Sequence, residues 1–366
     1  MAEPLKNLLY PGLVATMAEH LQAQHSGFDS ASFQARATKD MDSLELMQRA
    51  MQIRDALIET LPEDFDTAAA ILAAALPQKG RSGLTGWALL PVNHFIAARG
   101  LQHFDTAFDL LKQLTPHFTA EFGIRIFLHT DQARALAIIR PWTGDPNHHV
   151  RRLASEGTRP RLPWAMRLPQ LVVDPQPILP ILTALIDDPE DYVRRSVANS
   201  LNDIAKDHPD LVADFVNRAM VGATPERRWL LKHASRTLLK QGHRAALANF
   251  GFAETAGIIA SLAVRTPLVT FGQHADFDLL LSNESDSDAV LMVDYIVHHR
   301  KANGLTTPKV FKWKSLTLPA GKSAALSKRH AVRAITTRVY YPGEHRVEIQ
   351  INGTTVASGT IDLSMP

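Results

Sequence analysis

The chain has 366 residues, which is enough for a large buried core and, at about 100 to 200 residues per domain, for two domains. It contains no cysteine, so disulfides, thiolate zinc sites and thiol catalysis are excluded and an intracellular compartment is favoured. The formal net charge is only +2, but the segment from Arg151 to Arg167 holds five arginines and a single acid, Glu156. Such a local excess of positive charge predicts a polyanionic partner.

The sequence shows no targeting or membrane segment. The first twenty residues include acidic side chains and no long apolar run, unlike a signal peptide. The longest apolar runs, such as 68–76, are much shorter than the roughly 20 residues that a membrane-spanning helix needs. We therefore expect a soluble, cytoplasmic protein without a membrane partner.

Residues 1–252 have the apolar spacing of consecutive helices. Apolar side chains recur at steps of three and four residues, as at Leu46, Ala50, Ile53 and Leu57. Prolines interrupt this pattern at short intervals, so we predict a domain built from many helices of modest length.

Three segments of this region resemble one another. They begin at Asp145-Pro146, Asp188-Pro189 and Pro225-Glu226, and the first two continue as Val-Arg-Arg. Spacings of about 40 residues are typical of HEAT-like helix pairs, and proline and acidic residues suit the first turn of a helix. The valine is expected to point inward and the arginines to lie on an exposed face. Stacked repeats would then form a solenoid with an electropositive concave groove.

Residues 258–366 have the pattern of a β-sandwich. Seven short runs with strand character follow Gly257, namely 268–271, 277–281, 289–297, 309–314, 331–341, 346–351 and 356–363. Asn352-Gly353 predicts a two-residue hairpin between the last two runs, and we favour this interpretation over the glycosylation sequon Asn352-Gly-Thr354. The fold class is therefore mostly α, a HEAT-like solenoid followed by a C-terminal all-β sandwich of the immunoglobulin type.

The motifs of common metalloproteases, P-loop enzymes, dinucleotide-binding enzymes and serine hydrolases are absent from the sequence. We expect no metal and no cofactor, so any catalysis would depend on carboxylates, arginines and aromatic side chains.

Three acids lie near the basic helices: Glu121, Glu156 and Asp203. Each has a structural interpretation beside a catalytic one. Glu121 could complement the N-terminus of a helix capped by Thr119, and Arg152 with Glu156 could form an exposed i,i+4 pair worth a few tenths of a kcal/mol.

The tryptophans are expected to divide into two kinds. Trp164 follows two prolines in a basic linker, where its ring could contact a ligand or pack between repeats. We expect Trp142 and Trp229 to lie in the core.

The string Glu156-Gly-Thr-Arg-Pro-Arg-Leu-Pro-Trp164-Ala, with Arg151-Arg152 before it and Thr119-Ala-Glu-Phe-Gly-Ile-Arg125 further upstream, resembles the AlkC branch of the AlkC/AlkD bacterial DNA alkylation-repair glycosylases. The resemblance covers about residues 1 to 250, and some members of this branch carry a C-terminal immunoglobulin-like domain. It implies a monofunctional, nucleoid-associated enzyme that hydrolyses the N-glycosidic bond of 3-methyladenine, and possibly 3-methylcytosine, without full base flipping.

The resemblance also implies roles for individual residues. Glu156 and Trp164 are the first catalytic candidates, followed by Glu121 and then Asp203. Double-stranded DNA with alkylated bases is the expected partner, and no obligate protein partner is evident. Residues expected to hold DNA phosphates in the repeats are Arg152, Arg159, Arg161, Arg194, Arg195, Lys232 and Arg236.

Two further possibilities remain open from the sequence. Lys312 and Lys314 flank Trp313 on one face of a predicted strand, where they could grip the duplex or be ordinary solvated lysines. The whole chain could also be a non-catalytic helical-repeat scaffold that binds DNA or a protein, since such repeats often serve as scaffolds.

Overall fold

The computed structural model describes residues 3–252 and 256–365 and divides into two units. The first, here called the helical unit, comprises the described residues up to 207 together with 225–234. The second, here called the sandwich unit, comprises 208–224 and the described residues from 235 onward. Residues 1, 2 and 366, at the limits of the two expected domains, lie outside the described residues.

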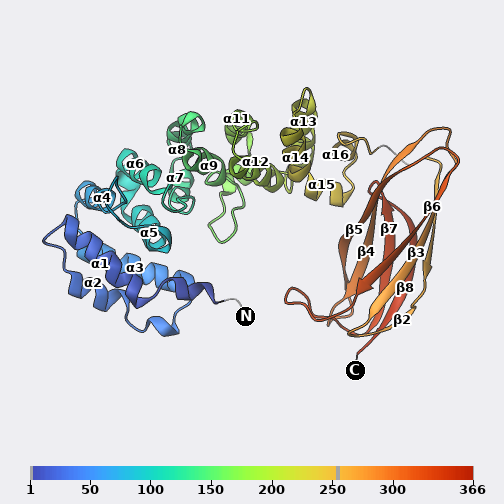
Figure 1. Ribbon diagram of the computed structural model, residues 1–366, viewed down its shortest axis with the longest axis horizontal. Coiled ribbons are helices and arrows are strands. Elements are labelled where there is room, and N and C mark those ends of the chain that lie inside the picture. Colours follow the sequence, from blue (N-terminus) through green and yellow to red (C-terminus); the bar gives the residue numbers. More distant parts are fainter. Residues whose placement is uncertain (1–2, 253–255, 366) are drawn as a thin grey trace. The chain divides into compact units, whose positions relative to one another are not determined.

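The helical unit consists of short helices stacked one after another (Figure 1). Its α-helices are α1 (Pro11–Gln24), α2 (Ser30–Ala37), α3 (Leu46–Thr60), α4 (Phe65–Ala74), α5 (Leu89–Arg99), α6 (Phe104–Leu114), α7 (Arg125–Thr130), α8 (Gln132–Ile139), α9 (His148–Glu156), α10 (Pro169–Val173), α11 (Leu179–Ala184), α12 (Asp191–Ile204) and α14 (Pro225–Ala234). Short 3₁₀ helices lie at η1 (Leu5–Leu8), η2 (Met41–Ser43), η3 (Gly86–Ala88), η4 (Gly100–Gln102), η5 (Arg140–Gly144) and η6 (Gln176–Ile178).

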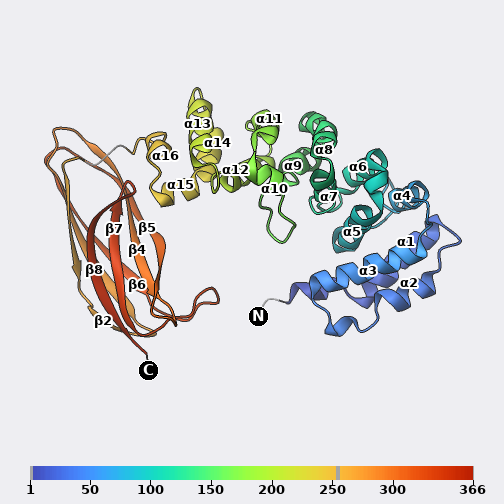
Figure 2. The same ribbon diagram turned by 180° about the vertical axis from the view of Figure 1, so that it is seen from behind.

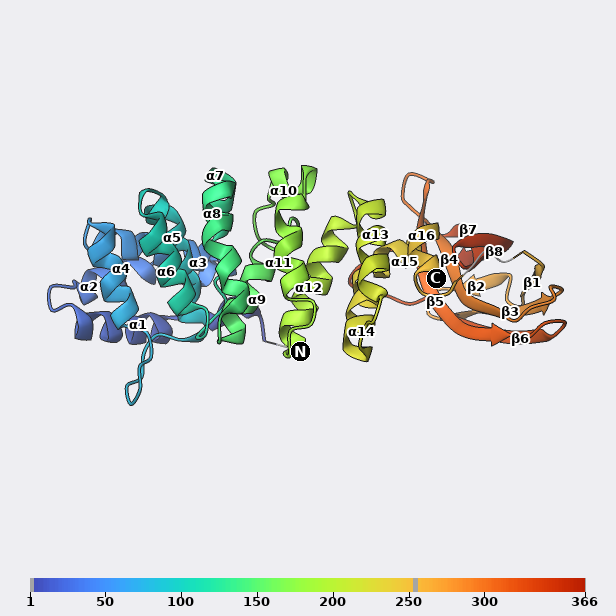
Figure 3. The same ribbon diagram turned by 90° about the horizontal axis from the view of Figure 1, so that it is seen from above.

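The predicted repeat is confirmed in the second half of this unit. Helices α9, α12 and α14 begin at or just after the three proline-containing turns, and α12 packs against both α9 and α14. Each helix buries one apolar face, and α9 does so through Val150 and Leu153. Helices α4, α6, α8 and α11 form a second row, seen from above in Figure 3.

The arginines of the repeats differ from the sequence expectation. Arg151 donates from Nη1 to the backbone oxygens of Asp145 and Pro146, and Arg194 donates to those of Asp188 and Pro189. Each guanidinium therefore binds the proline-containing turn that precedes its own helix and does not face solvent. Arg152 is also largely buried, which leaves Arg195 as the exposed arginine of the two Val-Arg-Arg motifs.

The sandwich unit contains α13 (Pro209–Met220), α15 (Arg236–Gln241), α16 (Arg244–Ala248) and two β-sheets. The strands are β1 (Ile258–Val264), β2 (Leu268–Thr270), β3 (His274–Asn283), β4 (Ala289–Arg300), β5 (Thr306–Leu318), β6 (Ser323–Ala331), β7 (Gly343–Ile351) and β8 (Thr354–Ser364). One sheet has the order β1-β3-β6 and the other β2-β8-β7-β4-β5, with β2 parallel to β8 and the other pairs antiparallel.

Apolar residues fill the space between the two sheets. Phe277 and Leu279 of one sheet pack in the same core cluster as Val347 and Ile349 of the other. A smaller apolar cluster joins α15 and α16 to the sandwich through Leu239, Leu247, Phe252 and Met292. There Gly242 and Gly353 approach so closely that a Cβ on Gly242 would lie 2.7 Å from the Gly353 backbone.

Two sequence predictions about the strands were tested directly. The hairpin is confirmed, because Asn352 and Gly353 join β7 to β8 with φ angles of 48° and 80°, as a type I′ turn requires. The predicted strand 331–341 is wrong. Only Ala331 belongs to a strand, and Val339 in the following loop is 70% exposed.

The two strands that the sequence prediction missed, β1 and β6, pair on either side of β3. Strand β6, SAALSKRHA, lacks β-branched residues and depends on its partner β3 for its conformation. None of the helices in the described residues has the length and apolar character needed to cross a membrane.

Candidate active site in the helical unit

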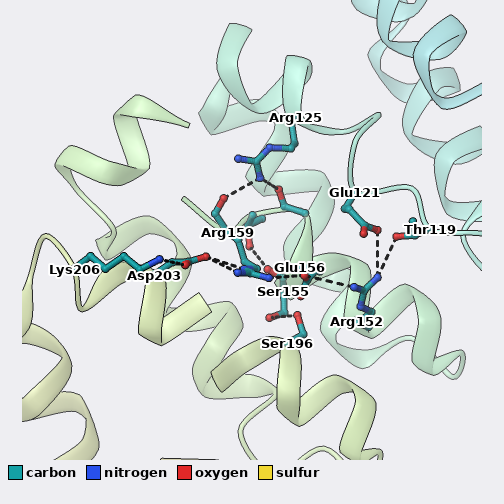
Figure 4. Close-up of polar contacts among 12 residues, drawn as sticks. Thr119, Glu121, Arg125, Arg152, Ser155, Glu156, Arg159, Ser196, Asp203 and Lys206 are labelled. Carbon is teal, nitrogen blue, oxygen red and sulfur yellow. Dashed lines mark hydrogen bonds and ion pairs between the residues drawn. The ribbon is translucent and has the colours of Figure 1, made fainter. Parts of the chain in front are cut away.

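Three separate segments of the helical unit bring the predicted acids together. Glu156 is the last residue of α9, Asp203 lies one residue before the end of α12, and Glu121 lies in the turns that precede α7 (Figure 4). All three are nearly inaccessible, with exposed fractions of 6%, 2% and 7%. Their side chains join two arginines, Arg152 and Arg159, in what we call the acid–arginine network.

Arg159 connects two of the acids. Its Nη1 donates to Glu156 Oε1 at 2.6 Å, and its Nε donates to Asp203 Oδ2 at 2.8 Å. The other oxygen of Asp203 accepts from Lys206 Nζ at 2.9 Å. The side chain of Arg159 is only 8% exposed, so its guanidinium is held inside the network and does not present a surface contact for phosphate.

Arg152 connects the third acid to the same network. Its Nη1 donates to Glu121 Oε2 at 3.2 Å and to Thr119 Oγ1 at 3.0 Å, and its Nη2 lies 3.5 Å from Glu156 Oε1. The i,i+4 pair considered from the sequence is therefore formed, but it is buried rather than exposed. Thr119 binds Arg152 instead of capping a helix, and α7 begins only at Arg125.

Burial governs the electrostatics of Glu121. Desolvation raises the pKa of this carboxyl above its ordinary value, the nearby charge of Glu156 adds to the increase, and Arg152 opposes it. Glu121 is thus a better proton acceptor than an exposed glutamate. Within residues 3–252 and 256–365, no three His, Asp or Glu side chains are placed to hold a metal ion.

One aromatic side chain contacts the network, and another lies in the loop that follows Glu156. Tyr192, which sequence reasoning missed, lies under Arg152 with the guanidinium carbon 4.8 Å from the ring centroid. Its only signal was its place before Val-Arg-Arg in the second repeat. Trp164 lies in the loop between α9 and α10, where it is 78% exposed and has a φ of 63°. Figure 2 shows this loop extending beyond the row of helices.

The other tryptophans are only partly as expected. Trp142 is buried, as predicted. Trp229 is 44% exposed, so its assignment to the core is wrong. It stacks on His233 with 5.2 Å between ring centroids, and the Arg195 guanidinium lies 5.5 Å from its ring.

The remaining predicted phosphate contacts have varied surroundings. Arg161 makes a bidentate ion pair with Asp207, at 2.8 and 2.7 Å. Arg195 is 63% exposed and pairs with Asp191, and Lys232 is exposed on α14. Within the sandwich unit, Arg236 is half-buried on α15, and Lys312 and Lys314 are exposed on β5 with the half-buried Trp313 between them.

One buried arginine beside the network was not among the predicted site residues. Arg125, the first residue of α7, has no exposed surface. It does not pair with Glu121 but donates to backbone oxygens of the loop that carries Trp164. The sequence placed Arg125 in a matching string but contained no sign of this contact.

Comparison with known proteins gives matches along almost the whole chain. The family described as "DNA alkylation repair enzyme" matches residues 95–238, and the family of the C-terminal Ig-like domain of YhaZ matches residues 258–365. The uncharacterized protein YhaZ of Bacillus subtilis is 35% identical over 352 residues, which are 95% of this chain and 96% of that protein. The structure of Pseudomonas fluorescens alkylpurine DNA glycosylase AlkC, bound to DNA containing an abasic site analog, matches with a TM-score of 0.88 and 34% identity over 99% of this chain and 100% of that one.

Helical repeats that match the DNA alkylation repair family, followed by an immunoglobulin-like domain, place this chain among DNA alkylation-repair proteins. The chain belongs to the AlkC family of DNA alkylation-repair enzymes, in which this sandwich follows the repeats.

Proposed function

We propose that this protein is a monofunctional DNA glycosylase that hydrolyses the N-glycosidic bond of cationic alkylated bases. The observation that carries the proposal is the convergence of Glu121, Glu156 and Asp203 in one buried network, next to a loop that exposes Trp164. The similarity to an alkylpurine DNA glycosylase solved with DNA supports the same activity and the same partner.

The chemistry of the lesion suits these residues. An adenine methylated at N3 carries a positive charge and leaves as a neutral base, so no strong acid is needed to protonate it. The deoxyribose then develops oxocarbenium character, which a nearby carboxylate stabilises. N3-methylated cytosine is also cationic and is the second substrate that we propose.

The residues of the network can be given distinct roles. We assign stabilisation of the oxocarbenium ion to Glu156 and Asp203, whose carboxylates are fixed by Arg159. We assign water orientation to Glu121, because its raised pKa favours proton acceptance. The exposed ring of Trp164 would lie against the cationic base or sugar, where a cation–π contact contributes about 0.5 to 2 kcal/mol.

An open surface is consistent with cleavage that does not need full base flipping. Trp164 projects into solvent, and the acids of the network lie at the ends of helices α9 and α12 and in the turns before α7. Selectivity would then depend on the charge and lability of the lesion. Most glycosylases instead insert the target base into a fitted pocket.

DNA binding is assigned first to the exposed cations. We propose phosphate contacts for Arg195 and Lys232 in the helical unit and for Lys312 and Lys314 in the sandwich unit. If the sandwich lysines grip the duplex, Lys312→Ala with Lys314→Ala will weaken DNA binding and reduce its salt dependence. Unchanged affinity in this double variant would assign them to the ordinary solvated surface.

The decisive test is release of the damaged base. The protein is incubated with duplex DNA containing 3-methyladenine, with 3-methylcytosine as a second substrate and a neutral lesion as the control. We expect free methylated base and alkali-labile abasic sites well above the spontaneous rate. Binding without release would contradict the proposal and favour the non-catalytic scaffold.

A further inference from the structure

We propose that Arg125 is a positioning residue, which fixes the loop that carries Trp164 relative to the acids of the network. The proposal rests on the proposed function, because it assumes that Trp164 acts on the substrate. Its structural part, that Arg125 holds the loop, can be tested without any activity.

A single guanidinium contacts both ends of this loop. Nη1 of Arg125 donates to the backbone oxygens of Gly157 at 3.0 Å and Arg159 at 2.8 Å, where the loop begins (Figure 4). Nε donates to the backbone oxygen of Met166 at 2.7 Å, where the loop returns toward α10. Because Arg125 has no exposed surface and its bonds to Gly157 and Arg159 are buried, water does not compete for those two bonds.

The conformation of Trp164 requires such support. A φ of 63° is rare for a bulky residue and persists only where the surrounding structure imposes it. The ring is 78% exposed, so burial of Trp164 does not supply that constraint. The bonds at the base of the loop therefore have to do so. Those of Arg125 join its two ends, together with the bond from the Leu168 amide to the Pro160 oxygen at 3.1 Å.

The same guanidinium relates the loop to the acids. Arg125 binds the backbone oxygen of Arg159, whose side chain joins Glu156 to Asp203. The loop also packs tightly against the residue that precedes Arg125, since a Cβ on Gly157 would lie 2.1 Å from Ile124 Cδ1. Burial lowers the pKa of Arg125 to about 10, so this side chain stays charged at neutral pH.

The first experiment measures loop order in the DNA-free protein by hydrogen exchange. The reporting amides are those of Arg159, Ala165 and Leu168, which donate to the backbone oxygens of Glu156, Leu162 and Pro160. We expect Arg125→Met to accelerate their exchange about tenfold or more. The matched control is Arg49→Met, because Arg49 is also buried and donates to three backbone oxygens, those of Lys6, Leu9 and Leu44.

The second experiment measures single-turnover base release and DNA affinity. We expect Arg125→Met to reduce the rate about 10- to 100-fold while Kd changes by less than about threefold, as displacement of a catalytic group predicts. In a Trp164→Ala background the same substitution should cost much less, because the group that it positions is already gone. Arg125→Lys keeps the charge, but the lysine cannot reach all three oxygens, so this variant should release base at an intermediate rate. It replaces Arg125→Met in both experiments if the methionine variant does not fold.

The outcomes separate the two hypotheses. Loop exchange that is unchanged in Arg125→Met and Arg125→Lys would overturn the positioning role whatever the activity. The role would also be overturned if Arg125→Met reduced the rate by the same factor in the wild-type and Trp164→Ala backgrounds. It would be overturned as well if Arg125→Met and Arg49→Met reduced the rate equally. A wild-type protein that releases no base would instead overturn the proposed function, while accelerated loop exchange would still support the contact of Arg125 with the loop.

Discussion

Replacing Arg159 by methionine distinguishes the two roles considered for this residue, a phosphate contact and a structural link between acids. Arg159 donates to both Glu156 and Asp203, and its side chain is 8% exposed. Removal of one partner from a buried ion pair costs about 3 to 5 kcal/mol. Glu156 would keep Arg152 at 3.5 Å, and Asp203 would keep Lys206 at 2.9 Å. We therefore expect the lower end, about 3 kcal/mol of unfolding free energy.

Two measurements check this expectation. Urea unfolding of the Arg159→Met variant should show the loss of stability, and single-turnover base release should fall about 100-fold because both acids lose their common anchor. The slope of log K against log salt should not change. A lost phosphate contact would reduce its magnitude by about 0.9.

The matched control is Arg195→Ala. Arg195 is 63% exposed and pairs with Asp191 on its own helix, so its removal should change stability by less than about 1 kcal/mol and should reduce the salt slope. If Arg159→Met behaved like Arg195→Ala, with native stability and a reduced slope, the structural role of Arg159 would be refuted. Neutralising the acids as well, in Glu156→Gln, Arg159→Met, Asp203→Asn, should recover part of the lost stability.

Three other predictions concern titration and packing. Because the pKa of Glu121 is raised, base release should decline as pH falls through that pKa, and Glu121→Gln should lower the rate and abolish this decline in a pH–rate profile. In the sandwich, burial lowers the pKa of His299 to about 3 and that of His330 to about 4, so the unfolded chain takes up protons first as pH falls below about 6.5. The contribution of these neutral histidines to the free energy of unfolding is therefore complete above that pH and is lost below it, by about 3 kcal/mol at pH 4 for His299. In the His299→Leu variant, the midpoint of urea unfolding should depend less on pH between 7 and 4. Gly157→Ala would force a Cβ against Ile124 and should reduce base release with little change in Kd, whereas an unchanged rate would contradict the tight packing.

Local sequence determined those parts of the protein in which neighbouring residues control the conformation. Spacing of apolar residues predicted the helices, the proline turns located α9, α12 and α14, and Asn352-Gly353 defined the β7–β8 hairpin. The string from Glu156 to Trp164 indicated the family that the comparisons confirm. These features depend on backbone preferences and side-chain periodicity, which are readable within a few residues.

Only the tertiary structure decided which side chains meet. The sequence suggested a helix N-terminus as the neighbour of Glu121 and a phosphate contact for Arg159. In the fold, Arg152 binds Glu121, and Arg159 joins acids from α9 and α12 that lie 47 positions apart in the chain. Pairings over such distances depend on how helices pack, and burial then decides whether a charge contacts solvent or another charge. For the same reason, β6 forms a strand by pairing with β3, and the β-rich residues after Ala331 form a loop in which Val332 and Tyr340 are buried and Val339 is exposed.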